Sequence, residues 1–266
     1  MTLHTLARGD SPLIIDFPHS GVLVPPALEA NLTPAARVRP DTDWHVEKLY
    51  AFAHGSGATL VIATHSRYVV DLNRDPRGVS LYPGADVTEL CPTTTFANEP
   101  IWSEGAAPNA ADVAARRAQF FDPYHATLHA EIERVRARHG YAVLLDAHSI
   151  RSEVPRFFAG RLPDLNLGTA NGASCAPALE AIAAGVLAHA PGFSHVVNGR
   201  FKGGYVTRHY GAPATTIHAL QLEIAQACYM DERPPYPWDP QRASALVAVL
   251  TRLVDALRSW REPRVA

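Results

Sequence analysis

The segment spanning residues 141–151 constrains the fold more than any other part of this sequence. An uninterrupted apolar run over residues 142–145 ends in a polar group that includes Asp146 and His148. An apolar run followed by polar residues is typical of a buried strand in an α/β sheet. Open α/β sheets bind their ligands at the carboxyl ends of such strands. The sequence therefore predicts an α/β protein with a site beside His148.

Asp146 and His148 are two residues apart, so their side chains lie on the same face of the predicted strand. A carboxylate close to an imidazole fixes its tautomer, and metal-binding histidines are usually held in this way. The alternative is a strand that ends in ordinary polar loop residues. Similar polar groups elsewhere in the chain favour the functional interpretation.

The length of 266 residues is enough for one α/β domain with a well-buried core. No shift in composition divides the chain, so we expect a single domain over residues 1–266, with an irregular insertion at about 78–108. The formal net charge is only -2, which gives no basic surface for nucleic acids or anionic membranes. We therefore expect a small-molecule partner.

The cysteine pattern and the lack of long apolar segments predict where the protein resides. Cys91, Cys175 and Cys228 are odd in number and far apart, which fits a reducing cytoplasm better than a disulfide framework. No window approaches the roughly 20 apolar residues of a membrane span, and the first ten residues lack the apolar core of a signal peptide. We expect a cytoplasmic protein, and no sequence feature predicts its oligomeric state.

Candidate metal ligands also occur early in the chain. The apolar run 13–17 predicts a core strand, which His19 closely follows; the alternative for His19 is a capped loop histidine. Asp41 and Asp43 begin a predicted helix that ends near residue 55. Acidic residues there stabilise the helix dipole, but one of them, or Glu47 one turn later, could equally supply a hard oxygen ligand.

Asn73 and Arg74 belong to a second segment, residues 68–76, which we predict to be an apolar strand that begins at Tyr68 and ends in Asp71, Asn73 and Arg74. A guanidinium binds a carboxylate through two parallel hydrogen bonds, and the neighbouring amide adds a donor. The pair is therefore a candidate site for a substrate carboxylate. A surface salt bridge is the alternative, which the buried run directly before the pair disfavours.

Glu223 lies inside the last predicted strand, residues 215–225, on the same face as Gln221. Burial raises the pKa of a carboxylate in so apolar a strand unless a cation or a metal is near. A general base would explain its presence. The alternative is a carboxylate paired structurally with a nearby cation.

The remaining elements follow from periodicity. We predict helices over 109–138 with a break at Pro123, 176–190 and 240–260, and strands over 59–64, 155–160, 165–169 and 195–198. His125 and His129 have the spacing of a helical metal pair, but their charged neighbours indicate a solvated face. Lys202 and Arg208 lie in a segment, 201–211, that is typical of an anion-binding turn, with a simple hairpin as the alternative.

Together these residues predict a catalytic zinc centre. His19, His148 and one carboxylate would leave a position open for water. Zinc lowers the pKa of such a water to about 7 and polarises a carbonyl, while Glu223 would pass the proton to a leaving amine. The predicted reaction is amide hydrolysis.

The predicted substrate is an acidic N-acyl compound, because several cations are available to hold a carboxylate. The residues predicted to bind it are Asn73, Arg74, Arg151, Lys202 and Arg208. Arg67 is a further candidate, and the sequence alone does not decide which of these cations face the substrate.

Five short motifs are distinctive as a set: residues 18–21 (PHSG), 41–46 (DTDWHV), 66–74 (SRYVVDLNR), 145–149 (LDAHS) and 203–211 (GGYVTRHYG). Through these motifs the sequence resembles a known family, the N-formylglutamate amidohydrolases (deformylases) of bacterial histidine degradation. The resemblance implies hydrolysis of N-formyl-L-glutamate to L-glutamate and formate. It also implies a phosphorylase/hydrolase-like three-layer fold with a central mixed sheet flanked by helices.

The order of motifs is more distantly similar to that of zinc carboxypeptidases and aspartoacylase-type deacylases. That likeness implies one zinc, or another divalent ion, bound by two histidines and an acidic residue. The residues that match are His19, Asn73, Arg74, His148 and Glu223. Val22 stands where those families carry the middle, acidic ligand, so we assign that role to Asp43, with Asp41 and Glu47 as alternatives.

Two other functions remain open. A zinc deacylase or carboxypeptidase acting on another acidic N-acyl amino acid would share the site and differ in pocket size. A catalytically silent amino-acid-binding protein would need neither a metal nor Glu223, so the presence of all these residues argues against it.

Overall fold

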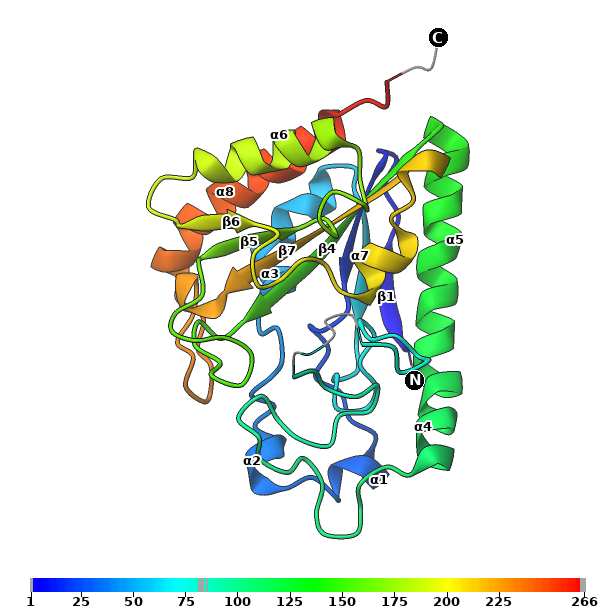
Figure 1. Cartoon of the computed structure of the whole chain (residues 1–266), viewed down its shortest axis with the longest axis vertical. Coiled ribbons are helices and arrows are strands. Elements are labelled where there is room, and N and C mark those ends of the chain that lie inside the picture. The colour runs from blue at the N-terminus through cyan, green and yellow to red at the C-terminus, as the bar shows by residue number, and fades with distance from the viewer. Residues whose placement is uncertain (1, 81–83, 85, 264–266) are drawn as a thin grey trace.

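The structure is a computed structural model and describes residues 2–80, 84 and 86–263. Within these residues, seven strands form one mixed sheet with helices on both faces (Figure 1). In spatial order the strands are β1 (His4–Ala7), β3 (Thr59–Ala63), β2 (Leu13–Phe17), β4 (Ala142–Ile150), β7 (Ile217–Ala225), β5 (Leu165–Gly168) and β6 (His195–Val197). The helices are α1 (Pro26–Glu29), α2 (Pro34–Arg37), α3 (Val46–Leu49), α4 (Ala110–Arg116), α5 (Asp122–His139), α6 (Pro177–Ala188), α7 (Tyr205–Tyr210) and α8 (Pro240–Ser259). The predicted α/β fold with a central mixed sheet is confirmed.

The four central strands, β3, β2, β4 and β7, run parallel to one another. Their carboxyl ends therefore meet at one edge of the sheet, where open α/β sheets bind ligands. The two longest strands, β4 and β7, pair along their whole length, from Ala142 opposite Ile217 to Ile150 opposite Ala225. This pairing fixes which side chains of the two strands stand next to each other.

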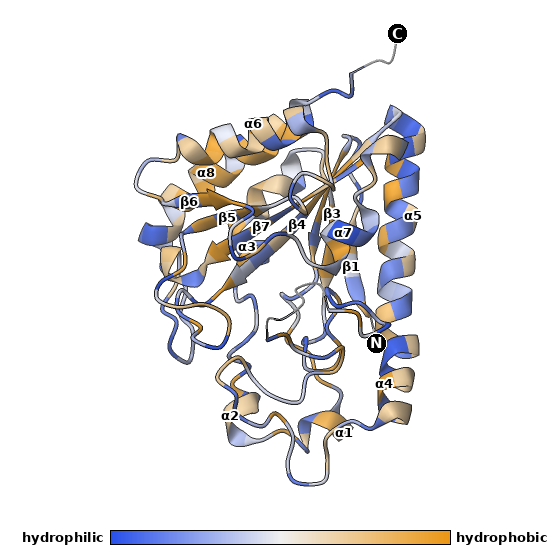
Figure 2. Ribbon diagram, in the orientation of Figure 1, coloured by the Kyte–Doolittle hydropathy of each residue, from blue (hydrophilic) through white to orange (hydrophobic). Residues whose placement is uncertain are grey.

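Hydrophobic cores lie on both faces of the sheet. Val143 and Leu145 of β4 pack in a core with α3, α6 and α8, whereas Ala142 and Leu144 pack in a core with α5 and α7. Figure 2 shows the apolar residues gathered along the central strands and on α6 and α8. A strand buried on both faces reads as a continuous apolar run, which is why the sequence predicts β4 so clearly.

The predicted strand that begins at Tyr68 is wrong. Residues 68–72 are buried, but they form a turn and an irregular segment. The backbone N–H of Asp71 donates to the carbonyl of Leu90 at 2.7 Å, and the Asp71 carboxylate accepts from the N–H of Asn73 at 2.9 Å. An apolar run without alternation does not distinguish a buried loop from a strand. The predicted strand over 155–160 is also wrong, because this segment is a turn.

Two predicted segments, around residues 201–211 and around Pro123, differ in detail. The segment 201–211, predicted as a turn or hairpin, contains the short helix α7. Instead of a break at Pro123, the chain passes from α4 through a π-helical segment, Arg117–Phe121, into α5. Pro123 lies in the first turn of α5, where a missing N–H is tolerated. The described residues of 78–108 contain no helix or strand.

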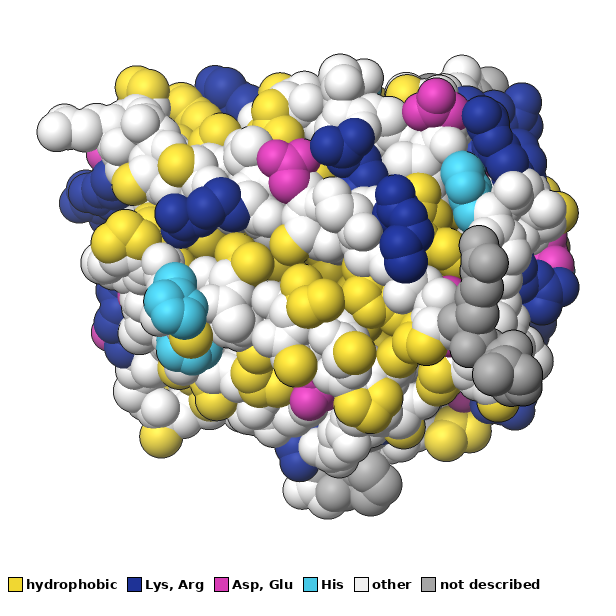
Figure 3. All heavy atoms as spheres, turned by 90° about the horizontal axis from the view of Figure 1, so that it is seen from above, with side chains coloured by type: hydrophobic (Ala, Val, Ile, Leu, Met, Phe, Trp, Pro, Cys, Tyr) yellow, Lys and Arg dark blue, Asp and Glu magenta, His cyan; other side chains and the backbone are white. Residues whose placement is uncertain are grey.

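The surface carries charges of both signs. Figure 3, which views the molecule from above Figure 1, shows basic, acidic and apolar side chains interspersed on that face. Among the helices of the described residues, none is both long and apolar enough to span a membrane.

Candidate active site

A row of buried polar side chains crosses the sheet face that α5 and α7 cover. The strand register places Asp16 beside Asp146, Asp146 beside Gln221, and His148 beside Glu223. Each of these five side chains belongs to a residue that is at most 7% exposed. Burying so many polar groups at the centre of a sheet costs free energy. Such a departure from an apolar core is expected where a protein carries its function.

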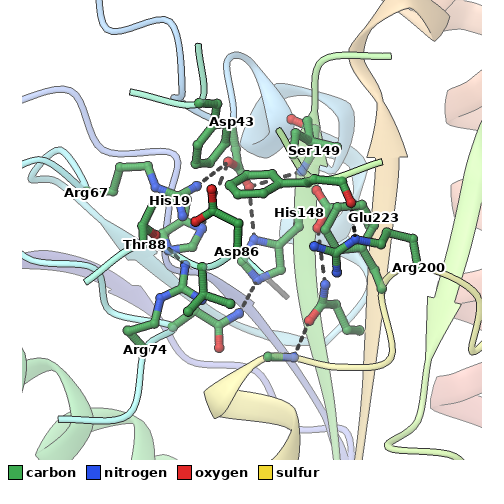
Figure 4. Close-up of a pocket in the computed structure, with 18 residues that line it drawn as sticks. His19, Asp43, Arg67, Arg74, Asp86, Thr88, His148, Ser149, Arg200 and Glu223 are labelled. Atoms are coloured by element: carbon green, nitrogen blue, oxygen red, sulfur yellow. Dashed lines mark hydrogen bonds and ion pairs between the residues drawn. The ribbon is translucent and has the colours of Figure 1, made fainter. Parts of the chain in front are cut away.

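His19, Asp43 and His148 form a compact group at the carboxyl ends of the central strands (Figure 4). Each offers one ligand atom, these atoms lie within 4.8 Å of one another, and all three residues are buried. His148 Nδ1 lies 3.0 Å from Asp43 Oδ2, and His19 Nδ1 lies 4.0 Å from Asp43 Oδ1. The structure thus brings together the three residues that the sequence predicts as metal ligands.

A separate buried carboxylate orients each histidine of this group. His19 Nε2 lies 2.7 Å from Asp71 Oδ1, and His148 Nε2 lies 2.7 Å from Asp146 Oδ1. A neutral imidazole whose Nε2–H donates to a carboxylate carries its lone pair on Nδ1. In both histidines Nδ1 faces Asp43, so the lone pair becomes available there when the ring is neutral. The sequence predicts the Asp146 contact but not the Asp71 contact, because Asp71 is far from His19 in the chain.

The charges of this group are strongly coupled. Burial alone would lower the pKa of His148, but the carboxylates of Asp146 and Asp43 raise it well above its usual value. Burial would likewise raise the pKa of Asp43, but His148, His19 and Arg67 hold it below its usual value. In the metal-free protein, a proton on His148 therefore neutralises part of the negative charge of Asp43 and Asp146. A bound metal cation would take the place of this proton.

The position of Asp43 is fixed from two sides. Its Oδ2 accepts a hydrogen bond from the backbone N–H of Ser149 at 3.0 Å, and Gln226 Nε2 donates to the carbonyl of Thr42 at 2.9 Å. The predicted N-cap role of this acidic segment is wrong, because α3 begins only at Val46 and its N-cap is His45. The Asp43 carboxylate is directed at the histidines instead.

The alternative ligands Asp41 and Glu47 lie outside this group. Asp41 Oδ2 accepts from the Tyr68 hydroxyl at 2.8 Å and from the Phe96 N–H at 3.0 Å. The helical pair at 125 and 129 is also outside it. His125 Nε2 lies 2.8 Å from the carbonyl of Leu72, and its Nδ1 lies 3.0 Å from the hydroxyl of Tyr210.

Glu223 stands beside His148 without belonging to the candidate metal group. Burial raises the pKa of Glu223 to about 8; His148 opposes this rise and Asp43 adds to it. Its Oε2 accepts a hydrogen bond from Gln221 Nε2 at 3.1 Å. A carboxyl group with a pKa near neutrality, in a pocket, has the properties of a general acid or base.

A pocket lies over these residues, with about 630 Å³ of space that includes open solvent at its mouth. Its lining residues are His19, Asp43, Arg67, Asn73, Arg74, Asp86, Val87, Thr88, Phe96, His148, Ser149, Ile150, Phe157, Arg200, Phe201, Gly204, Gln221 and Glu223. Arg67 and Arg74 lie on one side of the histidines in Figure 4, and Arg200 lies on the other, beside Glu223. The pocket therefore presents cations on both sides of the candidate metal group.

Of the cations that the sequence predicts to bind the substrate, some line the pocket and others do not. Arg74 lines the pocket, and its Nη2 donates to Asp71 at 3.1 Å and to Thr88 at 2.8 Å. Arg151, Lys202 and Arg208 are not among the described residues that line it. Arg200 lines the pocket, although no sequence motif predicts this. The residue follows β6 and is far along the chain from Arg67 and Arg74, the other lining cations.

Fold and site together define a class: a three-layer α/β protein with a buried His-Asp-His group and a separate buried carboxylate in one cation-rich pocket. The sequence model of the N-formylglutamate amidohydrolase family matches residues 11–230. The chain belongs to this family.

Curated relatives and a solved structure agree with this assignment. The chain is 49% identical over 95% of its length to an N-formylglutamate deformylase of Pseudomonas putida, of which it covers 94%. It is 50% identical over 97% of its length to an N-formylglutamate deformylase of Pseudomonas aeruginosa, of which it covers 97%. The crystal structure of N-formylglutamate amidohydrolase from Ralstonia eutropha JMP134 superposes with a TM-score of 0.80 at 28% identity, covering 96% of this chain and 97% of that one.

Proposed function

We propose that this protein hydrolyses N-formyl-L-glutamate to L-glutamate and formate with the help of one divalent metal ion, zinc by preference. The observation that carries the proposal is the buried group of His19, Asp43 and His148 beside a separate carboxylate, Glu223, in a chain half identical to curated deformylases. A cytoplasmic location agrees with the three cysteines, which are all unpaired.

The residues present fit a zinc ion. Two imidazole nitrogens and one carboxylate oxygen are the donor set of catalytic zinc sites that keep an open position. Both histidines are oriented through Nε2 by buried carboxylates, as metal-ligating histidines usually are. When bound in such a site, zinc polarises a carbonyl oxygen and lowers the pKa of a water molecule to about 7.

Glu223 is the proposed general base and acid. In its ionised form it would accept a proton from the attacking water and then donate it to the amine nitrogen that leaves as glutamate. Without a metal, the pKa of about 8 keeps much of Glu223 protonated at neutral pH. A cation bound nearby stabilises the carboxylate and lowers that pKa, so the base would be ready when the site is loaded.

The pocket cations are the proposed partners of the substrate carboxylates. N-formyl-L-glutamate carries two carboxylates, and Arg67, Arg74 and Arg200 lie on both sides of the candidate metal group. Guanidinium groups bind carboxylates through paired hydrogen bonds. The sequence predicts that Arg151, Lys202 and Arg208 contact the substrate. They are not among the described residues that line the pocket, so their positions do not support that role.

The direct test is an assay of formate release from N-formyl-L-glutamate, before and after treatment with a chelator. We expect turnover that is lost with the metal and restored by added zinc. The same assay with N-formyl-aspartate, N-acetyl-glutamate and N-succinyl-glutamate tests the alternative acyl groups. Faster turnover of an acetyl or succinyl substrate would contradict the formyl assignment, and full activity without metal would contradict the metal dependence.

A further inference from the structure

Two buried carboxamides, Asn73 and Gln221, are oriented by the backbone at the start of α7. The N–H of Val206 donates to Asn73 Oδ1 at 2.7 Å, and the N–H of Gly204 donates to Gln221 Oε1 at 2.6 Å. Because each amide oxygen accepts from the backbone, each amide NH₂ group must point the other way. The same short stretch of chain thus sets both orientations.

The NH₂ group of Asn73 points at Asp146, the carboxylate that orients the candidate metal ligand His148. Its Nδ2 donates to Asp146 Oδ2 at 3.0 Å and lies 2.8 Å from His148 Nε2. His148 Nε2 lies 2.7 Å from the other oxygen of the same carboxylate. Asp146 is therefore held between the amide and the imidazole. Asn73 is only 6% exposed, and both ends of its amide are bonded within the protein.

The NH₂ group of Gln221 points at the proposed base. Its Nε2 donates to Glu223 Oε2 at 3.1 Å. Gln221 and Glu223 are two residues apart on β7, so their side chains share one face of the strand. A hydrogen bond from a neutral amide stabilises the ionised carboxylate and restricts its rotation.

We propose that Asn73 and Gln221 are positioning residues, which the start of α7 orients so that Asn73 acts through Asp146 on His148 and Gln221 acts on Glu223. This gives Asn73 a different role from the substrate contact that its sequence motif predicts. The part that concerns Gln221 rests on the proposed function, because it needs Glu223 to be the base.

Gly204 belongs to the same arrangement. A Cβ atom at this position would lie 2.4 Å from Asn73 Nδ2, much closer than van der Waals contact allows. The backbone of Gly204 has φ of -81°, which other residues adopt easily. The glycine is therefore required by the approach of the Asn73 amide and not by its backbone conformation. A Gly204→Ala substitution should displace that amide while keeping every polar side chain.

The first experiment separates positioning from substrate binding. Zinc affinity of metal-free Asn73→Ala is measured by competition with a chromogenic chelator, and kcat and KM are measured at saturating zinc. We expect zinc affinity to fall by about 10- to 100-fold and KM to change by less than about threefold. Unchanged zinc affinity with a KM raised tenfold or more would overturn the proposal, because that is the result of a lost substrate contact.

Matched variants accompany this measurement. Arg200→Ala should show the reverse pattern, with a raised KM and nearly unchanged zinc affinity, because Arg200 lines the pocket and its Nε donates to the carbonyl of Phe157 at 2.6 Å. Arg233→Ala, at an exposed ion pair with Asp231, should change neither quantity. Gly204→Ala gives a second reading should Asn73→Ala fail to fold, and it should weaken zinc binding in the same direction. Zinc affinity at wild-type level in a folded Gly204→Ala would overturn the proposed role of α7.

The Gln221→Leu variant tests the second arm. We expect zinc affinity to remain and kcat to fall by roughly tenfold or more. The acidic limb of the pH–rate profile should move to higher pH by roughly 0.5 to 1 unit, which is the equivalent of one lost hydrogen bond to the Glu223 carboxylate. An unchanged profile with unchanged kcat would overturn this arm. Zinc titration needs no turnover, so inactivity of the wild-type protein on N-formyl-L-glutamate would refute the proposed function and leave the Asn73 arm testable.

Discussion

At the scale of single residues, the environment of Glu223 decides its chemistry. It is the buried carboxylate whose pKa burial raises to about 8, and it lies beside the candidate metal group rather than in it. We predict that Glu223→Gln, which keeps the shape of the side chain, retains bound metal but lowers kcat by roughly 10²- to 10⁴-fold. Formate release and metal analysis of the same sample measure both. A variant that keeps more than about a tenth of the activity would show that another group moves the proton.

His148 leads to a pH prediction. Asp146 and Asp43 raise its pKa well above the usual value in the metal-free protein, and a histidine must lose its proton to bind a metal. Metal binding should therefore release a proton, and zinc affinity should rise with pH, by about tenfold per unit while His148 is still protonated. Isothermal titration in buffers of different ionisation enthalpy counts the released protons. An affinity that is flat between pH 5.5 and 7.5, or falls as pH rises, would contradict this account of the site.

Single residues also show where sequence reasoning succeeds and fails. His19, Asp43 and His148 are predictable because each stands in a short polar motif next to an apolar run. The contact of Asp71 with His19 and the place of Arg200 in the pocket lining are not predictable in this way, because both depend on how distant segments fold together. Asp71 contacts His19 across 52 positions of sequence, and no local pattern contains that information.

At the scale of elements, β4 and β7 carry both the core and the site. On the face toward α8, the core contains Val143, Leu145, Leu220, Leu222 and Ile224. On the face toward α5 and α7, apolar residues are followed by Asp146 and His148 in β4 and by Gln221 and Glu223 in β7. The sequence predicts these two strands because they are continuously buried. It misassigns residues 68–72 and α7 because hydrogen bonds to distant groups, and not local propensity, decide their conformation.

The helix α8 packs on the sheet face opposite the candidate site, which gives a test of this division. Leu253 is fully buried in the core formed with α3 and α6. We predict that Leu253→Ala lowers the free energy of unfolding by about 2–5 kcal/mol and leaves the kcat of the folded protein within about twofold. Arg252→Ala, exposed on the same helix, should change the unfolding free energy by less than about 0.5 kcal/mol. Chemical denaturation and the formate assay provide the two readouts.

At the scale of the whole molecule, the site is assembled from segments that span most of the chain. The loop after β2, the loop before α3, the irregular segment that carries Asp71 to Arg74, and strands β4 and β7 all reach the same edge of the sheet (Figure 1). The parallel arrangement of the four central strands explains this convergence, because it turns all their carboxyl ends in one direction. The fold class was predictable from the sequence, and so were several residues that line the pocket, among them Arg74, His148 and Glu223, whereas the place of Arg200 in the lining was not.

The most direct measurement is a crystal structure of the zinc-loaded protein with anomalous diffraction recorded at the zinc edge. We predict one ion, about 2.0–2.2 Å from Nδ1 of His19, Nδ1 of His148 and a carboxylate oxygen of Asp43, with Glu223 beside it and not bound to it. An ion bound elsewhere, or one held by Glu223 in place of Asp43, would contradict the account.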